Sequence, residues 1–204
     1  MITLKINKYE QIGVNKYRIY FVNGEIIDTY DNVITANELL LKKEIDLNLY
    51  NKINNETTLE ENFIACKKYI DYRLRSTKEI KDYLKKKNIS DNNIELIIDK
   101  LTKLKYLDDD NFCKSFINDK LKFTNKGTYQ IIDELKKNNI NSSIIDKYSC
   151  LINDDIMNER IIKLINKSLK NKKDISKLRN KLYNNLVRLG YPIDLVITNL
   201  NNNF

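Results

Sequence analysis

The first thirty residues alternate apolar and polar positions with a period of two. Ile2, Leu4 and Ile6 begin this alternation, and residues 17–21 repeat it. Asn23-Gly24 lies just before the next apolar run, and this dipeptide is typical of a type I′ turn between antiparallel strands. The pattern therefore predicts a small antiparallel sheet that contains a β-hairpin.

Beyond these predicted strands the apolar residues recur at helical spacing. After a first helical segment, Ile45, Leu49 and Ile53 lie on one face of a second short helix. The Asn54-Asn55 pair is predicted to end this helix. Together these elements predict a small α+β domain, rich in strands, over residues 1–55.

The rest of the chain is predicted to be helical, because it has few of the residues that break helices. The whole sequence contains four glycines and one proline. Thr58 and Ser76 are each followed three residues later by glutamate, which is the capping-box pattern of a helix start. Further N-caps are expected within residues 108–110 and Asn141-Ser142 and at Asp154 and Asp174. The predicted helices span about residues 59–74, 77–87, 91–105, 109–124, 128–138, 142–152, 155–170, 175–189 and 192–200.

These helices form three similar groups when the sequence is compared with itself at an offset of 51 residues. The middle helix of each group is followed by Asn88, Asn139 or Gly190, residues that tolerate the left-handed conformation at a helix C-terminus. A mainly α fold is expected, with three tandem three-helix repeats at residues 58–108, 109–153 and 154–204. Because units of this size bury little apolar surface alone, neighbours should stack into an elongated array.

Composition excludes several classes of site. The chain has no histidine, which excludes Ser-His and Cys-His catalysis and histidine-ligated metals. Its three cysteines are far apart, and no glycine-rich phosphate loop occurs. Residues 108–110 are three aspartates, which we interpret as a helix N-terminus rather than a magnesium site. We therefore expect no enzyme activity, no metal and no cofactor.

Membrane and export signals are also not found in the sequence. Mean hydropathy is −0.53, and no apolar run approaches the ~18 residues of a membrane-spanning helix. The N-terminus has no apolar segment followed by a cleavage site. We expect a cytoplasmic protein without a membrane partner.

Positive charge is concentrated after residue 57. Residues 1–57 carry 7 Lys/Arg and 8 Asp/Glu, whereas residues 58–204 carry 29 and 20, so their net charges are −1 and +9. Basic residues recur near the ends of the predicted repeats, which indicates binding to an extended polyanion or an acidic filament. Arginine suits bidentate contact with phosphate or carboxylate, although at a helix end it also complements the helix dipole. The candidate binding residues are Arg73, Arg75, Lys85, Lys86, Lys120, Lys122, Lys126, Lys136 and Lys137.

Four motifs resemble the RecX family, the bacterial regulatory proteins of the RecA recombinase. Residues 65–76 (ACKKYIDYRLRS) are similar to the opening repeat of that family. Residues 106–113 (YLDDDNFC), Lys126-Gly127 and Gly190-Tyr191 resemble later motifs in the same order and spacing. The resemblance covers about residues 62–200.

The resemblance implies a modulator of RecA with no catalytic activity. RecX-like proteins lie in the groove of the RecA-DNA filament and limit its ATPase, strand exchange and co-protease activities, so the implied partner is that filament and the implied state is a monomer. The residues expected to hold the first and second repeats together are Leu107, Asp108, Asp109 and Phe112. The alternative function is direct binding of single- or double-stranded DNA through helix-turn-helix-like modules.

Overall fold

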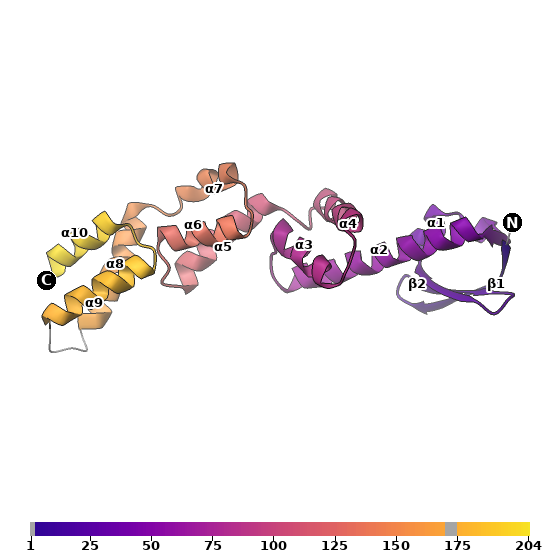
Figure 1. Cartoon of the computed structure of the whole chain (residues 1–204), viewed down its shortest axis with the longest axis horizontal. Coiled ribbons are helices and arrows are strands. Elements are labelled where there is room, and N and C mark those ends of the chain that lie inside the picture. The colour runs from indigo at the N-terminus through magenta and orange to yellow at the C-terminus, as the bar shows by residue number, and fades with distance from the viewer. Residues whose placement is uncertain (1–2, 170–174) are drawn as a thin grey trace. The chain divides into compact units, whose positions relative to one another are not determined.

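The computed structural model describes residues 3–169 and 175–204 of the chain. In this part of the chain a small antiparallel sheet precedes a series of helices, as Figure 1 shows. The chain divides into two compact units, Met1–Arg73 with Leu84–Tyr106 and Leu74–Tyr83 with Leu107–Phe204. The predicted fold class, tandem three-helix repeats after a small α+β domain, is confirmed.

The N-terminal sheet has four antiparallel strands in the order β3-β2-β1-β4. Its strands are β1 (Thr3–Gly13), β2 (Lys16–Phe21), β3 (Ile26–Tyr30) and β4 (Glu44–Asp46). Strands β2 and β3 follow the alternation of period two in the sequence, and β1 follows it only from Leu4 to Ile6, before a register shift between Ile6 and Lys8. On β2, Ile19 and Phe21 are buried, as this pattern predicts.

The turn between β2 and β3 differs from the predicted type. A type I′ turn needs positive φ at both central residues, but among the residues of this described turn only Gly24 has it, at 92°. The Gly24 amide donates to the Phe21 carbonyl at 3.0 Å, and the Phe21 amide donates to the Glu25 carbonyl at 2.9 Å. The hairpin is therefore present, but it has a three-residue loop in which a left-handed glycine follows the turn.

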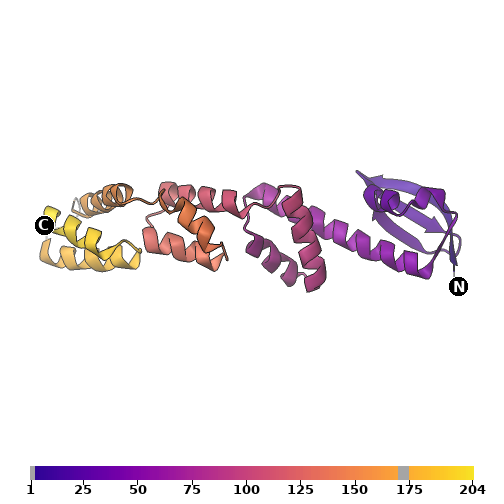
Figure 2. The ribbon, with the colours of Figure 1, turned by 90° about the horizontal axis from the view of Figure 1, so that it is seen from above.

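The sheet packs against helix α1 (Asp31–Ala36), the 3-10 helix η1 (Leu39–Leu41) and the N-terminal half of α2 (Leu47–Tyr72), as Figure 2 shows. The buried residues of this core are Leu4, Ile19, Phe21, Ile27, Val33, Ile34, Leu39, Ile45 and Ile53. Thr29 on β3 and Thr57 on α2 share a buried hydrogen bond of 2.6 Å between their hydroxyls. This bond gives both buried hydroxyls a partner, as burial requires.

The predicted second short helix differs from the structure at its start. Ile45 lies in strand β4, where it pairs with Leu4 of β1, and not in a helix. Helix α2 then begins at Leu47, whose N-cap Asp46 accepts a hydrogen bond from the Leu49 amide at 2.7 Å. The spacing of Ile45, Leu49 and Ile53 fits a helix, but pairing with the edge of β1 decides the conformation of Ile45 instead.

Helix α2 also continues through the predicted break at residues 54–58. The Thr58 hydroxyl donates to the Asn54 carbonyl at 2.9 Å inside the helix, so the predicted capping box at Thr58 is wrong. Continuation of the helix buries Thr57 and Phe63. The predicted boundary after residue 55 thus lies inside a helix, and the repeat limits 58–108, 109–153 and 154–204 stay a prediction.

The remaining helices agree closely with those read from the sequence. They are α3 (Thr77–Lys86), α4 (Asp91–Lys103), α5 (Asp109–Phe123), α6 (Thr128–Lys137), α7 (Ser142–Ser149), α8 (Asp154–Leu169), α9 (Ile175–Arg188) and α10 (Ile193–Asn203). The N-caps of α5 and α7 are Asp108 and Asn141, the first residue of each of the two predicted cap segments. For α8, the cap is Asn153, which accepts from the Ile156 amide at 2.9 Å, rather than Asp154. The predicted cap Asp174 lies outside the described residues.

The middle helix of each repeat ends in the same way. Asn88, Asn139 and Gly190 have φ of 58°, 53° and 84°, which confirms the predicted left-handed residues. The same two backbone hydrogen bonds follow in each repeat. The left-handed residue donates its amide to the carbonyl three residues before it, at Lys85, Lys136 or Val187. The next residue donates its amide to the carbonyl five residues before it, at Leu84, Leu135 or Leu186. This is the Schellman motif, and it occurs three times at 51-residue intervals.

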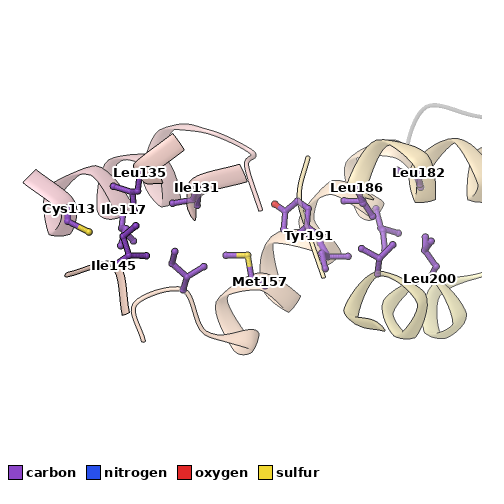
Figure 3. Close-up of a cluster of buried hydrophobic side chains, with 14 of the residues drawn as sticks. Cys113, Ile117, Ile131, Leu135, Ile145, Met157, Leu182, Leu186, Tyr191 and Leu200 are labelled. Atoms are coloured by element: carbon purple, nitrogen blue, oxygen red, sulfur yellow. The ribbon is translucent and has the colours of Figure 1, made fainter. Parts of the chain in front are cut away.

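The second and third repeats share one hydrophobic core. It runs from Phe112 to Leu200 and includes side chains from each helix from α5 to α10. Figure 3 shows Met157 and Tyr191 lying where the side chains of the two repeats meet. Both side chains are at most 1% exposed, so the two repeats are joined by an apolar interior.

Candidate interaction site

Lys120 and Lys122 lie in the last turn of α5, and the other candidate cations lie in two places that recur between repeats. One is the linker between the first and second helices, residues 73–76 before α3 and 124–127 before α6. The other is the C-terminal end of the second helix, with Lys85 and Lys86 on α3 and, 51 residues later, Lys136 and Lys137 on α6. Burial separates the cations that face water from those that stabilise the fold.

Arg75 is a buried member of the first linker. Its side chain is 8% exposed, and its Nη1 lies 3.4 Å from Oε1 of Glu79. The Ser76 amide donates to Glu79 Oε2 at 3.1 Å, and the Glu79 amide donates to Ser76 Oγ at 3.2 Å, which confirms the predicted capping box. Arg75 therefore stabilises a helix start and is poorly placed to contact a partner.

Lys126 occupies the equivalent position in the second linker, 51 residues after Arg75. Its ammonium pairs with Glu134, which also binds Lys120 at 2.9 Å. Partial burial opposes ionisation of Glu134, but the hydrogen bonds from Lys126 and Lys120 outweigh it and hold the pKa of Glu134 below its usual value. Much of the charge of both lysines is therefore balanced inside the repeat.

The other candidate cations are exposed. Arg73, Lys86, Lys122 and Lys136 face solvent, and the side chains of Lys85 and Lys137 are 61% and 72% exposed. Lys85 lies 3.6 Å from Asp91, and Lys137 lies 2.7 Å from Asp133. Exposed pairs of this kind contribute little energy and exchange readily with a competing anion. These six cations form the exposed basic set, and their role in binding stays a prediction.

The four residues expected to join repeats have distinct positions. Leu107 and Phe112 are 3% and 4% exposed, and Phe112 belongs to the core of the second and third repeats. Asp108 accepts from the Asn111 amide at 3.0 Å and so caps its own helix. Asp109 accepts from the Thr77 amide at 2.8 Å, which links the start of α5 to the start of α3. Of the four, Asp109 makes the hydrogen bond between repeats.

The second helices of successive repeats meet end to end at two places, which we call the first and second joints, and the sequence did not indicate these contacts. In the first joint the N-terminal end of α3 meets the C-terminal end of α6. Lys78 Nζ donates to the Lys137 carbonyl at 2.7 Å, and Ser76 Oγ donates to Asn138 Oδ1 at 3.4 Å. Each of these bonds, like that of Asp109, uses a side-chain atom.

The second joint brings together the N-terminal end of α6 and the C-terminal end of α9. The Gly127 amide donates to the Leu189 carbonyl at 2.7 Å, and the Tyr129 amide donates to the Gly190 carbonyl at 2.9 Å. Gln130 Nε2 donates to the Arg188 carbonyl at 2.7 Å. An offset of 51 residues maps Ser76 onto Gly127 and Lys137 onto Arg188, so the two joints are equivalent.

Arg160 supports the second linker from α8. Its guanidinium donates to the carbonyl of Leu121, to that of Thr124 at 2.6 Å and to that of Lys126 at 3.2 Å. These carbonyls lie at or beyond the C-terminal end of α5, where helix carbonyls lack intrahelical partners. The one available signal was that Arg160 is one of only six arginines in a chain rich in lysine.

Within residues 3–169 and 175–204, no three His, Cys, Asp or Glu residues group as a metal site would require. Burial raises the pKa of the Cys66 and Cys113 thiols to about 11 each, so both stay protonated at neutral pH. Among the described helices, none combines the length and apolar character needed to cross a membrane.

Comparison with known proteins gives consistent matches. Residues 64–101 match the family model "RecX, first three-helix domain". Regulatory protein RecX of Clostridium tetani is 32% identical over 93% of this chain and 91% of its own length, and that of Clostridium beijerinckii is 34% identical over 94% and 92%. The chain spans 64% of the longer Bacillus licheniformis relative, at 30% identity.

Solved structures agree in fold. A crystal structure of regulatory protein RecX superposes with a TM-score of 0.78 at 22% identity, covering 94% of this chain and 96% of the other. RecX from Lactobacillus salivarius superposes with a TM-score of 0.63 at 25% identity, covering 71% and 95%.

Proposed function

Because this chain belongs to the RecX family of regulatory proteins, we propose that it modulates the RecA recombinase, mainly as an inhibitor. In this proposal it binds in the groove of the RecA-DNA filament and limits ATP hydrolysis, strand exchange and co-protease activity. Its partner is the filament, and the chain performs no bond chemistry of its own.

The observation that carries the proposal is the recurrence of one joint at a 51-residue interval. Equivalent helix ends meet in both joints, and exposed lysines recur at equivalent sequence positions of the first and second repeats. A periodic partner can engage several such groups at once, and linked weak contacts then multiply into tight binding. A helical protein filament is a partner of this kind.

Electrostatics supports the same partner. The exposed basic set belongs to the repeats, whose sequence carries the excess positive charge. Exposed cations around a binding surface accelerate association with an acidic partner and make it sensitive to salt. Arg73 and Lys122 are the exposed cations at or beside the two linkers, and they are the first residues to test.

The test is RecA ATP hydrolysis on single-stranded DNA, titrated with this protein. We expect turnover to fall as the protein is added, and unchanged turnover at saturation would contradict the proposal. The double variant Arg73→Glu with Lys122→Glu should inhibit less, while Lys43→Glu, an exposed lysine of the N-terminal domain, serves as the control. If the double variant inhibits as well as the control, the contact residues are wrong but the function stands.

Salt dependence separates this function from direct DNA binding. Affinity for bare duplex DNA would fall with a slope of about −0.9 per phosphate contact in a plot of log K against log salt. Tight, steeply salt-dependent binding to bare DNA together with unchanged RecA turnover would support the alternative function instead.

A further inference from the structure

Two exposed aromatic side chains occupy the same position in the first and second repeats. Tyr72 is the last residue of α2 and is 86% exposed, and Phe123 is the last residue of α5 and is 72% exposed. They are 51 residues apart. Among the tyrosines and phenylalanines that the structure describes, these two are the most exposed.

The backbone around the two rings is also equivalent. The helix ends directly after each ring, and the next residue is extended, with φ −164° and ψ 157° at Arg73 and φ −130° and ψ 168° at Thr124. A four-residue linker then leads to the start of α3 or α6. Each ring is therefore held at a helix end by an ordered backbone rather than at the tip of a loose loop.

Folding gives no reason for an aromatic residue at these positions. A ring that is more than two-thirds exposed gains little from burial, and any residue compatible with a helix could occupy the last turn. Single exposed apolar residues are common on protein surfaces. The same exposure at the same position of two repeats is a second observation, and it points to the same kind of ligand at each ring.

The neighbouring charges indicate the chemistry of this ligand. The exposed side chain of Arg73 directly follows Tyr72 in the sequence, and Nζ of Lys122 lies 5.1 Å from the centre of the Phe123 ring. A ring beside a cation matches a nucleotide, whose base offers a π face and whose phosphate carries negative charge. In duplex DNA the faces of the bases are stacked on one another and are inaccessible to a protein ring. The ligand that fits these rings is therefore single-stranded DNA.

We infer that Tyr72 and Phe123 each stack on an unpaired base of single-stranded DNA, with Arg73 and Lys122 contacting the adjacent phosphates. This inference deepens the proposed function, because the RecA filament that it targets contains DNA. Each ring is a separate site within its own repeat. Stacking of this kind is sequence-tolerant, because every base has a π face.

The chain has no tryptophan, so Tyr72→Trp and Phe123→Trp each introduce a single fluorescent reporter at the ring position. The probes are an oligo-dT strand and an abasic strand of the same length and charge, each added at low salt. We expect oligo-dT to quench both tryptophans and the abasic strand to leave them bright. Val14→Trp, at a 91% exposed turn position, is the control and should not respond. Equal responses to the two strands, or no quenching, would overturn the inference.

Affinity provides the second measurement. Tyr72→Ala and Phe123→Ala should each weaken oligo-dT binding by about 5-fold or more, from the usual contribution of one stacked base. Tyr72→Leu and Phe123→Leu keep an apolar side chain without a flat ring, and they should weaken binding to a similar degree. Leucine variants that bind as tightly as wild type would contradict stacking.

RecA without DNA is the remaining probe in the fluorescence experiment, and it distinguishes a protein ligand from a nucleic acid. Quenching by RecA alone, without quenching by oligo-dT, would assign the rings to a protein contact and overturn the inference. If the wild-type protein inhibits RecA but oligo-dT quenches neither reporter, only this inference fails. If oligo-dT quenches both reporters and RecA turnover is unchanged, the inference stands and the proposed function fails.

Discussion

The second joint brings two backbones into direct contact, whereas the first joint connects equivalent helix ends through side chains. In the second joint Gly127 and Gly190 face each other, and amides donate directly to carbonyls at 2.7 and 2.9 Å. In the first joint Ser76 replaces Gly127 and Asn139 replaces Gly190, and the bonds are made by the side chains of Lys78 and Ser76. The register between helix ends is the same, but the atoms that contact each other are different.

This difference shows which features of the repeat fix its geometry. The left-handed residue and its Schellman bonds recur in all three repeats, so they set where each second helix ends. The contact that follows can then be made by backbone or by side chains. A backbone contact requires glycine on both sides, whereas a side-chain contact depends on particular polar groups and tolerates Cβ atoms.

The largest expected effect comes from adding a methyl group to the second joint. In Gly127→Ala the new Cβ would lie 2.5 Å from the carbonyl carbon of Gly190 and from the Tyr191 amide nitrogen, both backbone atoms that cannot move alone. Because φ at Gly127 is −86°, the cost is steric only. We expect the free energy of unfolding to fall by about 2–4 kcal/mol, measured by thermal or denaturant unfolding.

Two matched variants control this prediction. Ser76→Ala changes the equivalent position of the first joint, which already has a Cβ, and should cost about 1 kcal/mol or less. Gly24→Ala has open space around the new Cβ but keeps φ at 92°, so it isolates the cost of a left-handed alanine, about 1 kcal/mol. A Gly127→Ala variant no less stable than these two would refute the close backbone contact.

Removal of the Arg160 guanidinium should have the next largest effect. Arg160→Met leaves the carbonyls of Leu121, Thr124 and Lys126 without this donor. We expect a loss of about 2–3 kcal/mol, since hydrogen bonds from a charged donor are stronger than neutral ones. Arg179→Met is the control, because Arg179 is exposed and donates to the Asn201 side chain. Similar losses for the two variants would contradict a special role for Arg160.

Arg75 and Lys126 permit a direct comparison of the two linkers. Arg75 is 8% exposed beside Glu79, whereas the side chain of Lys126 is 30% exposed beside Glu134. Arg75→Gln should cost about 1–2 kcal/mol and Lys126→Gln less than about 1 kcal/mol, because solvent screens the more exposed pair. The midpoints of urea unfolding measure both. The reverse order of losses would show that exposure does not decide the contribution of these cations.

The smallest effect concerns pH and Glu134. Because the folded-state pKa of Glu134 lies below its usual value, its pairs with Lys120 and Lys126 contribute stability that is fully present above about pH 4.5 and is lost as pH falls. Glu134→Gln should therefore lose less stability than wild type between pH 6 and pH 3, by less than about 1 kcal/mol. Parallel pH profiles for the two proteins would contradict this contribution.

Local chemistry explains why the helices were predicted with nearly correct ends. Caps such as Ser76 and Asp108 and the left-handed residues Asn88 and Asn139 act on their own backbone within a few residues. Where a distant segment decides the local conformation, the prediction from sequence was wrong. Ile45 has helical spacing but lies in a strand, because it pairs with Leu4 across the sheet. The Asn54-Asn55 pair did not end α2, because the helix buries residues on both sides of that position.

The candidate site likewise has features that the sequence predicted and features that only the structure revealed. The sequence placed cations at the ends of the repeats, but it could not distinguish exposed Arg73 from buried Arg75, which are two residues apart in one linker. It also did not indicate Arg160 or the contact of Gly127 with Gly190, since these partners are more than thirty residues apart. The exposed rings of Tyr72 and Phe123 became visible only once burial was known for each residue.

The sequence by itself determined the fold class, the ends of most helices and the threefold repeat, because capping, helix periodicity and left-handed residues act through neighbours along the chain. Tertiary structure alone decided which cations and rings face water, where β4 pairs and how the joints are made. Those features depend on the approach of distant segments, whose positions follow from packing of the whole chain rather than from any local pattern.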